Sequence, residues 1–220
     1  MQKEFIKSLL PPEFLTLKRL ANEHFQSIKR RKSGTYSFQK LASQTNIKLE
    51  FGSGSKKGKL GWTTVDICPG ADIEWDLLND IPLPDNSVDA IYSSHLLEHL
   101  SYKELIRTLS DWFRLLKPQG KILICVPDAT HYLEAFFDPS KLEKFIPSFY
   151  APAFNYHSPL DYVNYIAYMD GNHKHLFDQA NLHAILKAVG YVHVKDREFD
   201  PSLDRMGHHW ESIYAEAMKP

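Results

Sequence analysis

The sequence predicts an α/β fold built on a doubly wound, mostly parallel sheet with an antiparallel strand at its C-terminal end. From residue 47 onward, short apolar runs separated by Gly, Pro and Asp alternate with longer helical periods, which is typical of α/β domains. Two glycines follow the first apolar run, where an open α/β sheet binds its ligands. The last two runs are joined by residues 201–209, a connection too short for a crossover helix, so those strands should pair antiparallel.

Six strands and two main helices are expected in this domain. The strands are predicted over Ile47–Phe51, Trp62–Ile67, Ala90–Ser93, Lys121–Val126, Tyr191–Glu198 and Trp210–Ala217. An amphipathic helix should lie between the third and fourth strands, because apolar residues from Leu105 to Leu116 repeat with helical spacing. A second helix should begin at an Asp178 N-cap and end at Gly190.

Two further segments flank or interrupt the domain, which is expected over residues 46–220. Residues 1–45 should form a helical extension, with Leu17, Leu20, Ala21, Phe25 and Ile28 packed on the domain and the basic cluster 29–32 at the helix end. Residues 131–173 form an aromatic-rich insertion. This insertion is either a small satellite core or a lid that grips a substrate, and the sequence leaves both readings open.

Composition excludes several classes of protein. Hydrophobic residues make up 43% and charged residues 24% of the 220 residues, which fits a globular protein rather than a disordered one. The net charge of −1 gives no field that would attract nucleic acid. No apolar run reaches the roughly 18 residues of a membrane span, and Cys68 and Cys125 form no metal or disulfide pattern. We therefore expect a soluble, cytoplasmic protein without a bound metal.

A glycine bend and a strand-end acid carry the main functional signal. Gly52 and Gly54 follow the first predicted strand, and either a close ligand or a turn with positive φ would select them. Asp66 ends the second strand, where its carboxylate can accept both hydroxyls of a ribose or can bond its own turn. A dinucleotide is disfavoured, because Lys57 replaces the third glycine and only seven residues separate Gly54 from Trp62, too few for the phosphate-binding helix.

Residues 48–128 resemble the class I S-adenosylmethionine-dependent methyltransferases, in particular type 11-like members with Gly-Trp after a short glycine loop. The matching motifs are Gly61-Trp62 with Asp66, Asp76-Leu77, residues 81–89, residues 93–99, and Leu116-Lys117-Pro118-Gln119-Gly120, where Gln119 replaces a family glycine. The resemblance implies a Rossmann-like methyltransferase fold with S-adenosylmethionine as cofactor. It also implies that Glu50, Gly52 and Gly54 line the methionine part, Asp66 the ribose, Asp76 and Leu77 the adenine, and Ser93, Ser94 and His95 the sulfonium. The complete set expected to bind the cofactor adds Phe51, Ser53 and Ile67.

Two histidines are the candidate catalytic residues. Methyl transfer to a hydroxyl or amine needs a base, and His95 and His99 are the leading candidates, although each could instead have a structural role at a helix end. His173 and His175 are secondary candidates. The expected acceptor is a small molecule or saccharide, with no nucleic-acid partner, and a homodimer is left open.

Two rival functions remain at this point. A noncatalytic module could keep the fold to bind a nucleoside or a partner protein. A zinc peptidase is the second rival, because His95-Leu96-Leu97-Glu98-His99 also spells His-x-x-Glu-His. The peptidase is disfavoured, because the motif directly follows a strand and no second motif supplies a third zinc ligand.

Overall fold

A seven-stranded sheet forms the centre of the protein, seen here in a computed structural model that describes residues 12–138, 140–143 and 158–220. The strands are β1 (Lys48–Phe51), β2 (Trp62–Asp66), β3 (Ile73–Glu74), β4 (Val88–Ser94), β5 (Leu116–Pro127), β6 (Val192–Asp196) and β7 (Ser212–Met218). Their order across the sheet is β3-β2-β1-β4-β5-β7-β6. The pairs from β3 to β5 are parallel, whereas β7 runs antiparallel to both neighbours. The predicted mostly parallel sheet with an antiparallel C-terminal strand is therefore confirmed. The two-residue strand β3 was not predicted, because so short a run carries no periodicity.

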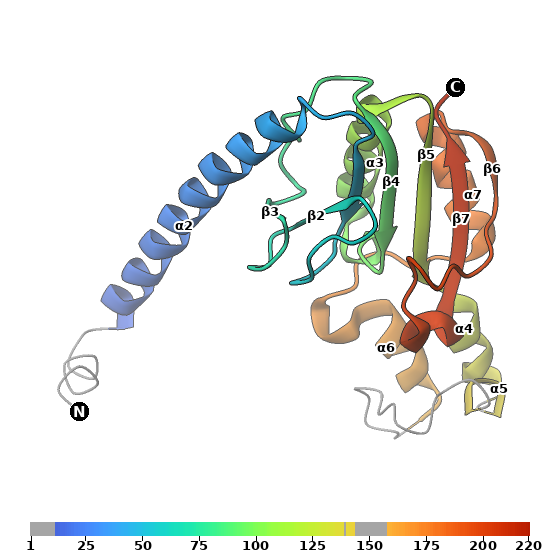
Figure 1. Ribbon diagram of the computed structural model, residues 1–220. Helices are drawn as coiled ribbons and strands as arrows, with labels where there is room; N and C mark the ends of the chain where they lie inside the picture. The colour runs from blue at the N-terminus through green and yellow to red at the C-terminus, as the bar shows by residue number, and fades with distance from the viewer. Residues whose placement is uncertain (1–11, 139, 144–157) are drawn as a thin grey trace.

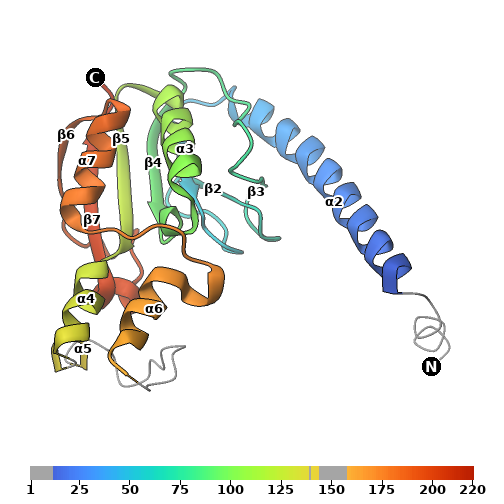
Figure 2. The same cartoon turned by 180° about the vertical axis from the view of Figure 1, so that it is seen from behind.

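Two helices cover the same face of this sheet in both views (Figures 1 and 2). They are α3 (Tyr102–Leu115) and α7 (Gln179–Val189), close to the expected positions. The apolar side of α3 packs on the sheet, where the Trp112 ring stacks on Phe51 with 4.7 Å between centroids. Asp178 caps α7 by accepting a hydrogen bond from the Asn181 N–H at 2.6 Å, and Gly190 ends this helix with a positive φ of 115°.

The connection between β6 and β7, which contains the short helix η3 (Met206–Glu211), contacts the opposite face of the sheet at Tyr92 of β4. Asp204 in this connection is buried and forms a bidentate ion pair with Arg197, at 2.6 and 2.8 Å. The Tyr92 hydroxyl of β4 donates to the same carboxylate at 3.0 Å. This network fixes the connection beside the ends of the central strands.

Helix α2 (Pro12–Leu41) differs from the sequence prediction. It extends away from the sheet beside β3 and is longer than expected, so the basic cluster 29–32 lies inside the helix rather than at its end (Figure 1). Phe25, for example, is 62% exposed, and only the C-terminal part packs on the domain, with Phe38 against Trp75. The four other apolar residues expected to pack are also exposed: Leu17, Leu20, Ala21 and Ile28. The prediction that this face packs on the domain was therefore wrong, because the spacing of apolar residues does not show whether a partner surface exists.

The aromatic insertion lies beyond the end of the sheet toward which β4 points (Figure 1). Its described parts are α4 (Ala129–Phe137), α5 (Ser140–Glu143), α6 (Leu160–Tyr168) and η2 (Met169–Gly171), and residues 144–157 of the insertion lie outside the described chain. Helices α4 and α6 form a second apolar cluster around Tyr132, Tyr165 and Ile166. The satellite core is therefore present, while a lid motion stays a prediction. None of the described helices has the length and apolar character needed to cross a membrane.

Candidate functional site

The bend after β1 depends on two glycines with positive φ. Gly52 has a φ of 77°, and a Cβ there would lie 2.7 Å from the Cβ of Leu96, so both conformation and space require glycine. Gly54 has a φ of 64°, but an added Cβ would meet nothing within 4 Å. Gly54 therefore borders open space, where a ligand can approach the backbone closely.

Asp66 lies directly against this bend. One of its carboxylate oxygens accepts the Gly54 N–H at 2.8 Å and the other accepts the Cys68 N–H at 2.7 Å. The carboxylate thus bonds its own turn, as one reading of the sequence anticipated, and it also fastens the tip of β2 to the glycine bend. Each carboxylate oxygen can still accept a further hydrogen bond.

A cavity of about 320 Å³ opens at the carboxyl ends of β1 and β4. Its lining residues are Glu50, Gly52, Ser53, Gly54, Ser55, Lys56, Ser94, His95, Arg205 and His208. Glu50, only 8% exposed, forms an ion pair with the Lys56 ammonium group. The cavity therefore offers a fixed negative and a fixed positive charge beside the exposed backbone of the glycine bend. We refer to it below as the first cavity.

His95 lies where the first cavity meets a second one. Its backbone has a φ of 50°, an uncommon conformation for a residue with a side chain, and such strain is concentrated at functional sites. Its Nε2 lies 2.8 Å from the Ser212 hydroxyl oxygen. Burial lowers the pKa of His95 to about 4, so the imidazole is neutral at pH 7.

The second cavity, of about 250 Å³, lies between the end of the sheet and helix α6. Its polar lining consists of His95, Glu98, His99, His173, Arg205, His208 and Glu211, and its apolar lining of Pro127, Tyr165, Ile166 and Met169. Glu98, from the short helix η1 (Leu97–His99), is 2% exposed, and burial raises its pKa to about 8. The cavity is therefore small, polar and rich in histidine.

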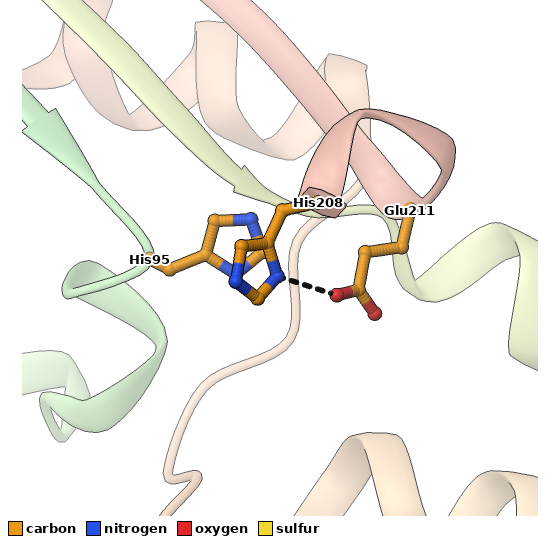
Figure 3. A group of neighbouring side chains, drawn as sticks. All are labelled: His95, His208 and Glu211. Atoms are coloured by element: carbon orange, nitrogen blue, oxygen red, sulfur yellow. Dashed lines mark hydrogen bonds and ion pairs between the residues drawn. The ribbon is translucent and has the colours of Figure 1, made fainter. Parts of the chain in front are cut away.

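Three of these side chains form a connected group, shown in Figure 3. The rings of His95 and His208 lie 4.6 Å apart, and His208 Nδ1 is 3.0 Å from a carboxylate oxygen of Glu211. The other Glu211 oxygen accepts a hydrogen bond from the Tyr132 hydroxyl at 2.6 Å. Helix η3 thus brings His208 and Glu211 to the turn after β4, although more than 100 residues separate them in sequence.

The structure brings together about half of the cofactor residues expected from the sequence. Six of them line the first cavity: Glu50, Gly52, Ser53, Gly54, Ser94 and His95. Phe51 instead points into the core, because alternate residues of a strand face opposite sides. Asp66 contacts the glycine bend but lines neither cavity, and the same holds for the buried Ser93, the exposed Ile67, Asp76 and Leu77, which also line neither.

The histidine candidates are also divided. His99 and His173 line the second cavity, whereas His175 packs beside Phe177 and lines neither cavity. Lys56, Arg205, His208 and Glu211 were missed. Arg205, His208 and Glu211 belong to a charged, histidine-rich segment before the final strand, and this composition could have marked them as candidates. Only the fold shows that this segment returns to the site.

The His-x-x-Glu-His motif does not have the geometry of a zinc peptidase. His95 lies outside η1 with a left-handed backbone, so the two histidines do not lie one turn apart on a helix. Glu98 lies between them instead, with one oxygen 3.6 Å from His95 Nδ1 and 3.7 Å from His99 Nε2. The motif therefore provides no zinc-binding pair of histidines.

Comparison with known proteins places this site in context. Residues 63–124 match the family model described as a methyltransferase domain. A probable S-adenosylmethionine-dependent methyltransferase of Mycolicibacterium smegmatis is 37% identical over 60 residues, which are 27% of this chain and 23% of that protein. The match thus spans about a quarter of the relative's length.

Solved structures share the fold. A SAM-dependent methyltransferase from Archaeoglobus fulgidus superposes with a TM-score of 0.51 at 16% identity, over 95% of this chain and 100% of that one. A Haemonchus contortus phosphoethanolamine N-methyltransferase 2, solved with S-adenosyl-L-methionine, gives a TM-score of 0.49 at 14% identity, over 84% of this chain and 52% of that one. At 16% identity, the likeness to the Archaeoglobus fulgidus structure concerns the fold alone.

Proposed function

We propose that the chain is a class I S-adenosylmethionine-dependent methyltransferase and that it transfers a methyl group from S-adenosylmethionine to a small-molecule or saccharide acceptor. The observation that carries this proposal is the first cavity, where the glycine bend and Glu50 meet Ser94 and His95. The cavity lies at the carboxyl ends of parallel strands, where open α/β sheets bind their ligands.

The charges of the first cavity fit the amino-acid part of this cofactor. Its ammonium group would bind Glu50 and its carboxylate would bind Lys56, so the two ligand charges would replace the ion pair between these side chains. Gly54 leaves space for the ligand to approach the backbone. Lys56 would thus provide the contact to the methionine carboxylate.

The ribose and adenine contacts extend the same proposal. Asp66 would accept hydrogen bonds from the ribose hydroxyls with the remaining lone pairs of its carboxylate. Asp76 and Leu77 would then border the adenine, as the family pattern implies. Both residues belong to the loop that follows β3, the neighbour of β2 in the sheet.

The second cavity is the proposed acceptor site. It adjoins the first cavity at His95, Arg205 and His208, which line both. Its histidine and carboxylate lining suits an acceptor rich in hydroxyl groups better than an apolar one. S-adenosylmethionine supplies, when bound, a methyl group on a positively charged sulfur. The protein then has to hold the acceptor atom in line with that methyl group. It also has to remove the proton of the acceptor, and His95, which lines both cavities, is the proposed base.

Calorimetry with S-adenosylmethionine and S-adenosylhomocysteine tests the cofactor site. Glu50→Gln and Asp66→Ala should each weaken binding at least tenfold, because the first removes the negative charge that would pair with the ligand ammonium group and the second removes the acceptor of the ribose hydroxyls. Glu216→Gln is the matched control, since it also breaks an ion pair with a lysine, Lys195, but lies outside both cavities. Unchanged affinity in Glu50→Gln and Asp66→Ala would refute the assignment.

A product assay separates an enzyme from a noncatalytic module of the same fold. The protein is incubated with S-adenosylmethionine and pooled saccharides and small hydroxylated metabolites, and S-adenosylhomocysteine release and acceptor mass are followed. The proposal expects a mass gain of one methylene group in an acceptor. Tight cofactor binding with no product in any pool would favour the noncatalytic module.

A further inference from the structure

We propose that Glu98, His99 and His173 form a binding site for a divalent transition metal such as Zn²⁺, in the wall of the second cavity. One potential ligand atom from each residue lies within 4.8 Å of the others. Two imidazoles and one carboxylate are an established ligand set for zinc, and such sites keep a further position open. Here that position would face the second cavity, which all three residues line.

The hydrogen bonds of the two histidines prepare them as ligands. His99 Nδ1 lies 3.0 Å from the carbonyl oxygen of Asn172, and His173 Nδ1 lies 2.8 Å from that of Ile166. A carbonyl only accepts, so both Nδ1 atoms carry the proton and both Nε2 atoms keep a free lone pair. Metal-binding histidines are typically oriented in this way by an acceptor behind the ring.

Glu98 gives an independent indication of a ligand. Its Oε2 atom is buried and has no hydrogen-bond partner within the described chain, and the residue, which is only 2% exposed, lines the cavity. Burial of a polar atom without a partner is costly, and a cation in the cavity would remove that cost. The Glu98 Oε1 atom lies 3.7 Å from His99 Nε2, close to the spacing of about 3.3 to 3.5 Å between tetrahedral zinc ligands.

The neighbouring group of His95, His208 and Glu211 also has three potential ligand atoms within 4.8 Å of one another, but its atoms already have partners. His95 Nε2 bonds Ser212, and Glu211 bonds both His208 and Tyr132. A metal there would have to break these contacts. The hydrogen bonding therefore favours Glu98, His99 and His173.

A metal at this position would also contact the methyl acceptor. This role of the metal rests on the proposed function. The open position would take a hydroxyl oxygen of the acceptor and lower the pKa of that hydroxyl. The metal site itself depends only on the three protein ligands.

The test uses the full chain, stripped with EDTA and titrated with Zn²⁺ by calorimetry and with Co²⁺ by visible absorption. We expect one ion per chain, and at least tenfold weaker binding in His173→Ala, His99→Ala and Glu98→Gln. His175→Ala and His208→Ala should bind normally, because the first changes a histidine outside the cavities and the second a histidine of the neighbouring group. His99 is the most exposed of the three proposed ligands, so His99→Ala reports on binding even if His173→Ala fails to fold.

Three outcomes would overturn the metal site. The first is no binding at micromolar Zn²⁺. The second is equal binding in all the variants, which is what scattered exposed histidines would give. The third is loss of binding in His208→Ala alone. S-adenosylhomocysteine affinity is measured in parallel without metal. Failure of the cofactor to bind would refute the proposed function while leaving the metal result intact.

Discussion

At the residue scale, Gln119 occupies a backbone position suited to glycine. Its φ is 66°, and it replaces a glycine of the family motif near the start of β5, where the pairing with β4 is irregular. Gln119→Gly should raise the free energy of unfolding by roughly 0.5 to 1 kcal/mol, because it relieves the strain of a left-handed residue. Urea unfolding measures the change. Gln119→Ala, which keeps a Cβ, should give no comparable gain, and an equal gain in both variants would contradict the strain argument.

His95 should make the fold sensitive to acid. Glu98, His208 and Glu211 surround its ring, but burial dominates and lowers its pKa from 6.5 to about 4. Between pH 4 and pH 6.5 the unfolded chain therefore binds a proton at His95, whereas the folded chain does not. The contribution of neutral His95 to the free energy of unfolding is complete above pH 6.5 and is lost as the pH falls toward 4. The fall in pKa corresponds to about 3 kcal/mol.

The variant His95→Asn tests this prediction, because asparagine tolerates a positive φ and does not titrate. Urea unfolding of the metal-free protein between pH 7 and pH 4 should show a smaller loss of stability in His95→Asn than in the unchanged protein. Parallel pH profiles for the two proteins would show that His95 does not carry this acid sensitivity.

At the element scale, the connection between β6 and β7 depends on one buried ion pair. Asp204 is fully buried and binds Arg197 through both oxygens. Asp204→Ala should lower the free energy of unfolding by about 3 to 5 kcal/mol, because it leaves the Arg197 charge buried without a partner. Asp200→Ala, at a half-buried position in the same connection, removes the acceptor of two hydrogen bonds from Ser202 and should cost about 1 kcal/mol. Similar losses in both variants, measured by urea unfolding, would contradict the role of Asp204.

At the scale of the whole molecule, α2 is joined to the domain mainly through its C-terminal end (Figure 2). Phe38 is fully buried against Trp75, and Phe38→Ala should cost about 3 to 5 kcal/mol. Phe25 is exposed on the projecting part, so Phe25→Ala should change stability by no more than about 0.5 kcal/mol. Urea unfolding of both variants measures this contrast. A large loss for Phe25→Ala would mean that another surface covers this face in solution.

The sequence by itself determined the sheet, its main strands and helices, and the position of the glycine bend. These features follow from local signals: apolar periodicity, an N-cap at Asp178, and glycines where φ must be positive. The match to the methyltransferase family has the same local basis, because its motifs lie on strand ends that are close in sequence.

Only the tertiary structure decided which distant side chains share a cavity and which apolar faces are covered. His208 and Glu211 reach the turn after β4 because β7 inserts between β5 and β6, and the connection before β7 must return across the sheet. Phe25 stays exposed although its spacing matches that of a packed helix. Both outcomes depend on contacts between segments far apart in the chain, and local sequence patterns do not encode such contacts.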